Sequence, residues 1–190
     1  MQTLAFDGRT GASGDMILGA LVAAGADPDV LAPVKAALPV TYRIGETTRN
    51  GIRATSVDVV LDADAVPADE TERDRGGDEH THGHHHDHDD GNAHEHHHDH
   101  DHQHAEGSGF TRSYAECQAL VEGMALPDPI ADDATAIFVL LGRAEAAVHG
   151  TDLEETHFHE VGADDAIADI VGAALLLSDL DVDRVVTTPV

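Results

Sequence analysis

The sequence has few of the residues on which several classes of protein depend. It has one cysteine, Cys117, so no internal disulfide can hold the fold, and a reducing compartment is the simpler interpretation. The chain has only 10 Lys and Arg but 37 Asp and Glu, and the resulting net charge of −27 repels nucleic-acid phosphates. The longest apolar stretches, Met16–Ala24 and Ile170–Leu177, fall far short of the roughly 20 residues of a membrane-spanning helix, and no signal peptide is recognisable. We therefore expect a soluble cytoplasmic protein that binds neither nucleic acid nor membrane.

Lysine is almost absent, since Lys35 is the only one, and Asp is about twice as frequent as Glu. A surface rich in Asp and poor in Lys suits a salt-filled cytoplasm, because the Debye length falls to about 3 Å at molar salt and screens the self-repulsion of the chain. This pattern favours a halophilic source. The alternative is an ordinary acidic protein of a mesophile.

Histidine is concentrated in one segment, since 13 of the 16 histidines lie between His80 and His104. The candidate metal ligands in this segment are His82, His84, His85, His86, His88, His94, His96, His97, His98, His100, His102 and His104. Imidazole suits nickel, zinc, copper and cobalt, and the interleaved Asp87, Asp89, Asp99 and Asp101 add charge and further ligands. We interpret the segment as a flexible arm that collects divalent ions. The alternative is a solvated linker, or one that responds to pH near 6.5.

Strand and helix patterns alternate along the rest of the chain, which predicts the α/β class, with an α+β arrangement of the same elements as the alternative. We expect a small sheet with a β-hairpin and packed helices. Strands are predicted at Thr3–Phe6, Tyr42–Arg49, Ile52–Leu61 and Arg184–Thr188, with the hairpin turn at Asn50-Gly51. Helices are predicted at Gly14–Ala24, Pro28–Leu38, Ser113–Gly123, Asp128–Gly150 and Asp164–Leu177, with a helical turn at Thr151–Glu155 and an extended segment at Thr156–His159.

The chain divides into two structured halves and an insertion. Residues 62–109 hold almost no large apolar side chains, so burial cannot offset the entropy of ordering them, and we expect a disordered metal-binding insertion. Residues 1–61 and 110–190 are then the first and second halves of one α/β domain.

A second group of chemical side chains lies near the C-terminal end, in the run His157-Phe-His-Glu160 and the residues after it. On a strand, His157 and His159 point to the same side. Asp165 and Asp169 are four residues apart and share one face of a helix. Converging imidazoles and carboxylates make a metal site or an acid–base centre. The alternative is that the acids favour the helix dipole at its N-terminus while the histidines are surface residues.

A glycine-rich turn joins the first strand to the first helix. The run Asp7-Gly-Arg-Thr-Gly-Ala-Ser-Gly-Asp15 can present backbone N–H groups to an anion at Gly11, Ser13 and Gly14, and its two acids are available to a metal or a ribose. It lacks the Gly-Lys-Ser/Thr ending of a P-loop and the dinucleotide-binding spacing. A tight turn capped by Ser13 is the alternative.

These motifs together resemble the LarC family of nickel insertion proteins. The resemblance is carried by Ser-Gly-Asp-Met at 13–16, Arg-Asn-Gly-Ile at 49–52, the His-rich insertion, and His-Phe-His-Glu-Val-Gly-Ala at 157–163 followed by Asp165 and Asp169. It implies a CTP-dependent insertion of Ni(II) into pyridinium-3,5-bisthiocarboxylic acid mononucleotide, a lyase or chelatase type of reaction that forms metal–carbon and metal–sulfur bonds. The product is the nickel-pincer nucleotide cofactor.

The resemblance also gives roles to the candidate residues. The implied catalytic set is Asp7, Asp15, Glu160, Asp165 and Asp169, the implied cofactor-binding set is Gly11, Ser13 and Gly14, and His157 and His159 join the histidines of the insertion as metal ligands. Members of the family usually continue into a C-terminal domain associated with nucleotide binding and oligomerisation, where we expect CTP and Mg²⁺ or Mn²⁺ to bind. The chain is then an N-terminal module that acts in an oligomer, with a separately encoded second half, or it is the product of a truncated gene model.

One different function fits the same sequence. A storage or chaperone module for nickel or zinc needs only the His-rich insertion and no substrate. An insertion module needs the group around His159 as well, so the two hypotheses differ in what a change at His159 does.

Overall fold

The computed structural model describes residues 1–9, 11–49, 51–62, 112–158 and 161–188. The strands are β1 (Thr3–Phe6), β2 (Val40–Arg49), β3 (Ile52–Leu61) and β4 (Arg184–Thr187). The α-helices are α1 (Gly14–Ala24), α2 (Ala32–Ala37), α3 (Tyr114–Gly123), α4 (Asp128–His149) and α5 (Asp164–Asp179), with 3-10 turns at Pro28–Leu31 and Leu153–Glu155. The predicted α/β class is confirmed. The predicted disordered insertion lies outside the described residues, apart from its first residue.

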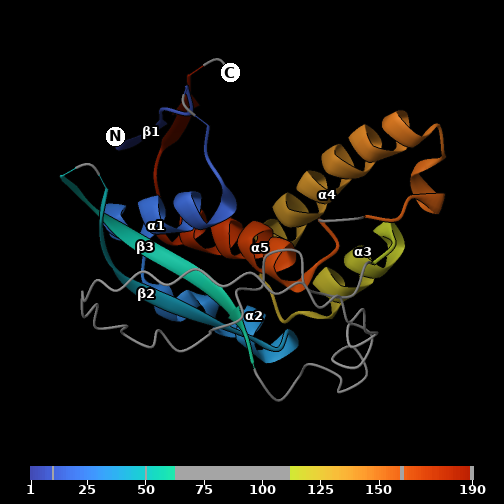
Figure 1. Ribbon diagram of the computed structural model, residues 1–190, viewed down its shortest axis with the longest axis horizontal. Coiled ribbons are helices and arrows are strands. Elements are labelled where there is room, and N and C mark those ends of the chain that lie inside the picture. The colour runs from blue at the N-terminus through green and yellow to red at the C-terminus, as the bar shows by residue number, and fades with distance from the viewer. Residues whose placement is uncertain (10, 50, 63–111, 159–160, 189–190) are drawn as a thin grey trace, which may run out of the picture.

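The helices α1, α5, α4 and α3 follow one another in a series that begins at the β2–β3 hairpin (Figure 1). Helix α1 packs on β3, α5 on α1, α4 on α5, and α3 on α4. The core between them is built by apolar side chains that are shielded from solvent, among them Leu18, Leu21, Val57, Phe138, Ile167 and Val171. Helix α5 is therefore the central element, and it is buried along most of its length.

The two sheets are separate. Strands β2 and β3 form the antiparallel hairpin expected from the Asn-Gly pair, with Val40 opposite Leu61 and Arg49 opposite Ile52. Strands β1 and β4 pair in parallel, with Thr3 beside Arg184 and Phe6 beside Thr187. In Figure 1 this parallel pair stands away from the hairpin, above α1 and α5. It brings the turn after β1 next to the end of β4.

Local end signals in the sequence fix most of the boundaries. Ser113 and Glu116 form a capping box at the start of α3, and Gly25 and Gly150 end α1 and α4 in the left-handed conformation. Asp27 accepts a hydrogen bond from the backbone N–H of Asp29 at 3.0 Å, as an N-cap does. The ends predicted for the helices Gly14–Ala24, Ser113–Gly123 and Asp128–Gly150 agree with these signals.

Two details of the predicted helices are wrong. The single helix expected over Pro28–Leu38 is a 3-10 turn followed by the short α2, because Pro33 lacks an N–H and its ring would clash inside a continuous helix. The spacing of apolar residues in the helix expected over Asp128–Gly150 predicts one apolar face with Ile130, Ala134, Ile137, Phe138, Leu141 and Ala144, but Ala144 is exposed. Gly142 and Ala146 are buried instead, because the contact stripe along this long helix continues from Phe138.

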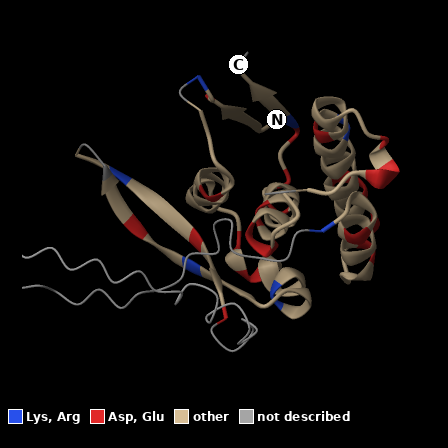
Figure 2. Ribbon diagram, turned by 45° about the vertical axis from the view of Figure 1, so that its right-hand side comes forward, with Lys and Arg blue, Asp and Glu red and all other residues tan. Residues whose placement is uncertain are grey.

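In Figure 2, positions of Asp and Glu are marked on several helices and strands, and positions of Lys and Arg on fewer. No described helix is both long enough and apolar enough to cross a membrane.

Cys117 lies on α3 with its side chain shielded from solvent, and burial raises the pKa of its thiol to about 11. Because the thiolate is the reactive form, we expect a thiol reagent at pH 8 to react about 100-fold more slowly with the folded chain than with the chain in urea. Ellman's reagent, followed at 412 nm, measures both rates. Equal rates would show that the thiol is accessible and would contradict its role as a packing residue.

Candidate functional site

The first turn of α1 lies directly against Asp169 of α5. A Cβ atom placed on Gly14 would come 2.0 Å from Oδ2, 2.5 Å from Cγ and 2.7 Å from Cβ of Asp169, so only glycine fits at this position. A carboxylate at the N-terminus of a helix is stabilised by the helix dipole. The structure therefore brings together the turn and the carboxylate that the sequence placed 155 positions apart.

Ser13 and Asp15 complete this end of α1. Ser13 occupies the N-cap position, but its side chain accepts no capping hydrogen bond, and its hydroxyl donates to the carboxylate of Asp15. The alternative interpretation, a turn capped by Ser13, therefore agrees with the N-cap position of Ser13, but the capping hydrogen bond is not formed because the hydroxyl points to Asp15. Gly11, the other predicted anion-binding position, has φ of +87°, which favours glycine.

Asp165 lies one helical turn before Asp169 on α5. The Oδ1 atoms of both carboxylates are shielded from solvent. Tyr42 of β2 reaches this part of α5, where its hydroxyl donates to the carbonyl of Ala168 at 2.8 Å. Burial, and then the charge of Asp169, raise the pKa of Tyr42. The neutral phenol keeps its hydrogen bond to Ala168 beside Asp169. Tyr42 was not among the candidate residues predicted from the sequence, where its only sign was its place at the start of the predicted strand Tyr42–Arg49.

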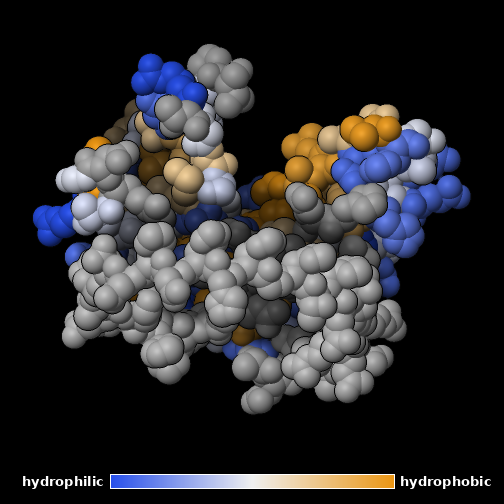
Figure 3. Space-filling view, viewed as in Figure 1, coloured by the Kyte–Doolittle hydropathy of each residue, from blue (hydrophilic) through white to orange (hydrophobic). Residues whose placement is uncertain are grey.

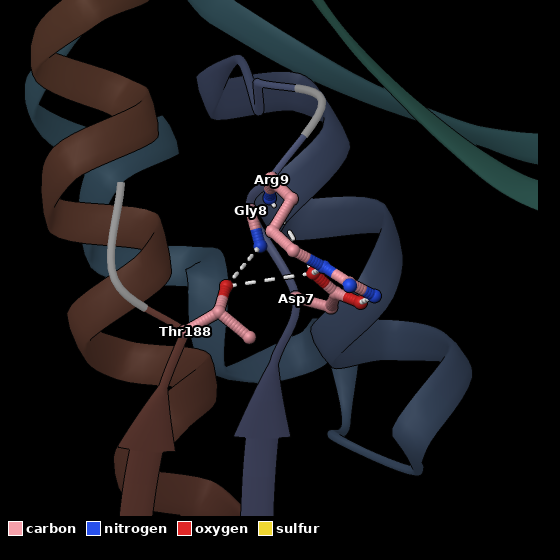
Figure 4. A network of polar contacts seen from close by, with 4 residues as sticks. All are labelled: Asp7, Gly8, Arg9 and Thr188. Atoms are coloured by element: carbon pink, nitrogen blue, oxygen red, sulfur yellow. Dashed lines mark hydrogen bonds and ion pairs between the residues drawn. The ribbon is translucent and has the colours of Figure 1, made fainter.

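Asp7 takes a different place, at the ends of β1 and β4 (Figure 4). Arg9 binds its carboxylate with two nitrogens, Nε at 2.8 Å and NH2 at 2.6 Å, and this contact lowers the pKa of Asp7. Thr188 accepts from the backbone N–H of Gly8 at 3.1 Å and donates to Asp7 at 3.4 Å. In this structure Asp7 thus joins the two parallel strands.

The segment that carries His157 is held by an antiparallel bridge to the start of α3. Ser113 pairs with His157, Tyr114 N–H donates to the Thr156 carbonyl at 2.9 Å, and Phe158 N–H donates to the Arg112 carbonyl at 3.0 Å. The ring of Phe158 is buried against Tyr114 and Phe138, with ring centroids 6.5 and 6.2 Å away. His157 is exposed, next to the charge of Glu116 at the capping box.

Arg112 binds the residues that follow this segment, Gly162 and Asp164. It was not among the candidate residues predicted from the sequence. Its guanidinium donates to the Gly162 carbonyl at 2.9 Å and forms an ion pair with Asp164 at 2.7 Å. The Arg112 side chain is 20% exposed and that of Asp164 is 7% exposed. Arg112 therefore joins the start of α3 to the start of α5. The only sign of this role in the sequence was that Arg112 is one of just ten basic residues in a strongly acidic chain.

We expect an Arg112→Met variant to lose about 3 kcal/mol of unfolding free energy, because Asp164 would keep a buried charge without its cation. Its Tm should fall by roughly 10 °C in thermal unfolding followed by circular dichroism. Replacing both residues, as Arg112→Met with Asp164→Leu, should recover most of the loss. Arg9→Met is the control, since its pair with Asp7 is exposed. A loss in the double variant as large as in Arg112→Met would contradict this account.

The remaining predicted ligands lie outside the described residues. These are His159, Glu160 and the histidines of the insertion from His82 to His104. Within the described ranges, no group of three or more His, Cys, Asp or Glu side chains is spaced to hold a metal ion.

Comparison with known proteins gives a family. The chain matches the nickel insertion protein family over residues 4–190. It is similar to the pyridinium-3,5-bisthiocarboxylic acid mononucleotide nickel insertion protein of Akkermansia muciniphila, with 37% identity over 194 residues, and to that of Desulfitobacterium hafniense, with 34% identity over 193 residues. All of this chain is covered, but only 39% and 37% of those relatives. No solved structure matches the chain. The chain belongs to the nickel insertion protein family.

Proposed function

We propose that this chain binds Ni(II) and delivers or inserts it into pyridinium-3,5-bisthiocarboxylic acid mononucleotide, which makes the nickel-pincer nucleotide cofactor. The match to the nickel insertion protein family over residues 4–190 is the observation that carries the proposal. The relatives in Akkermansia muciniphila and Desulfitobacterium hafniense bear the name of this reaction.

The first turn of α1 and the acidic face of α5 are the proposed substrate site. Backbone N–H groups at a helix N-terminus suit the phosphate of a mononucleotide. The carboxylates of Asp165 and Asp169 suit a divalent cation, and Asp169 lies against Gly14 of that same turn. A cation and an anionic ligand would thus be held side by side. When a ring carbon binds nickel it releases its proton, and a carboxylate of α5 is a suitable acceptor.

The His-rich insertion has a different proposed role. Its many imidazoles would collect nickel, while His157 and His159 would receive it near the substrate site. Storage of nickel or zinc without a substrate is the competing function, and it needs the insertion alone.

CTP and Mg²⁺ or Mn²⁺ belong to the proposed whole reaction, in an oligomer located in a salt-rich cytoplasm. We propose that the site for the Mg²⁺–nucleotide lies in the region of the longer relatives that this chain does not match.

The test separates collection from insertion. The chain, with and without the remaining part of the Akkermansia muciniphila relative, is mixed with the pincer nucleotide, NiCl₂, CTP and MgCl₂, and the nickel product is measured by mass spectrometry. Deleting Glu79–Glu106 should reduce the number of nickel ions bound, but should leave product formation intact at saturating nickel. His159→Ala and Asp169→Asn should abolish the product while most of the bound nickel remains.

Two outcomes would reject the proposal that the His-rich insertion collects nickel while the substrate site inserts it. If the deletion and His159→Ala remove product formation equally at saturating nickel, the insertion is more than a collecting arm. If no product forms under any condition while nickel still binds, storage is the better function.

A further inference from the structure

Helix α4 carries an apolar row on its exposed side. Ala136, Leu140, Ala144 and Val148 are spaced by four residues and are all exposed, with Leu140 67% and Val148 79% exposed. We call these four residues the α4 row. Figure 3 shows apolar surface on α4 where it borders a hollow, and the parallel β1–β4 sheet forms the opposite wall of this hollow. Large exposed apolar side chains in such a row mark a surface that another polypeptide covers.

The opposite wall is also incomplete. In the described part of the chain, β1 and β4 pair only with each other, so each strand has an open edge. Thr3, Ala5 and Val185 are exposed on these strands, and Val185 is 42% exposed. Parallel sheets are normally covered on both faces, and two strands alone are marginally stable in water. The described residues therefore supply neither a further strand nor a complete cover for this sheet.

The comparisons indicate what covers these surfaces. About three-fifths of the length of the Akkermansia muciniphila and Desulfitobacterium hafniense relatives lies outside the region that matches this chain. A second copy of this chain is the less favourable occupant, since each copy carries a formal charge of −27 and the two would repel each other. We propose that the α4 row and the open β1–β4 sheet form one docking surface for the polypeptide that corresponds to the remaining part of the longer relatives.

The proposal predicts a binding experiment with defined probes. The parts of the Akkermansia muciniphila and Desulfitobacterium hafniense relatives outside the matched region are expressed as separate polypeptides and titrated with this full chain by calorimetry. A 1:1 complex is expected with at least one of them. Leu140→Asp with Val148→Asp should weaken it by about 30-fold or more, because a charge would enter an apolar contact. Ile52→Asp is the matched control, since Ile52 is 72% exposed at the tip of the hairpin and should leave the affinity unchanged.

A second measurement does not depend on substitutions. Complex formation should slow hydrogen exchange of amides in β1 and β4 by about tenfold or more, because their edges become paired or covered. Thermal unfolding of each variant shows whether it is folded. The proposal is overturned if neither probe binds the unchanged chain, or if the folded double variant binds as tightly as Ile52→Asp. A self-association of this chain that Leu140→Asp abolishes would assign the surface to a second copy.

Discussion

Replacement of Gly14 by alanine is expected to reduce the unfolding free energy by about 3 kcal/mol and to lower Tm by roughly 10 °C. An alanine in a helix normally stabilises it by about 0.5–1 kcal/mol relative to glycine, so the expected sign is the reverse of the usual one. The reason is the approach of α5. The new Cβ would come 2.7 Å from Cβ of Asp169, and rotation of the carboxylate cannot relieve that contact. The two helices would have to separate at the proposed substrate site.

Gly123→Ala is the matched control for this prediction. Gly123 is the last residue of α3, and an added Cβ would meet nothing within 4 Å. Its unfolding midpoint should stay the same or rise in the same buffer. In an Asp169→Gly background, Gly14→Ala should be less damaging, because Oδ2, Cγ and Cβ of Asp169 are gone. A Gly14→Ala variant as stable as Gly123→Ala, with no dependence on Asp169, would show that the two helices do not meet in this way.

The sequence was sufficient for elements whose ends carry local signals. Ser113 and Glu116 are three residues apart and form a capping box whatever the rest of the chain does. The Asn50-Gly51 pair gives the hairpin register because the turn fixes which residues oppose each other. Such signals depend on neighbours along the chain, so they are visible without a structure.

Contacts between distant segments carry no such signal. The pairing of Phe6 with Thr187 joins strands separated by almost the whole chain, and their short four-residue patterns suit many partners. The same holds at the site. The sequence placed Asp165 and Asp169 on one face of a helix, but it could not show that this face meets Gly14. Arg112 was missed because it precedes the long α4 in the sequence, whereas its partners, Gly162 and Asp164, follow that helix.

A second large effect is expected from salt. Raising NaCl from 0.1 M to 2 M should raise Tm by about 10 °C or more, equivalent to a few kcal/mol. The formal charge of −27 destabilises the compact state by self-repulsion. The Debye length falls from about 10 Å at 0.1 M to about 3 Å at 1 M, so the repulsion between neighbouring carboxylates is progressively removed. Thermal unfolding at a series of NaCl concentrations measures the effect.

Substitutions of acidic residues test whether charge repulsion causes the expected rise of Tm with salt. Glu122, Glu154 and Glu155 are exposed, and Glu122 lies near the C-terminus of α3, where a negative charge is unfavourable. Replacing all three with glutamine should raise Tm at 0.1 M NaCl and reduce the further gain at 2 M. Sucrose stabilises folded proteins by exclusion from their surface, so its effect should be equal in both chains. A Tm that stays flat or falls with NaCl would show that the acidity does not oppose folding, and the link between Asp-rich composition and a salt-filled cytoplasm would lose its physical basis.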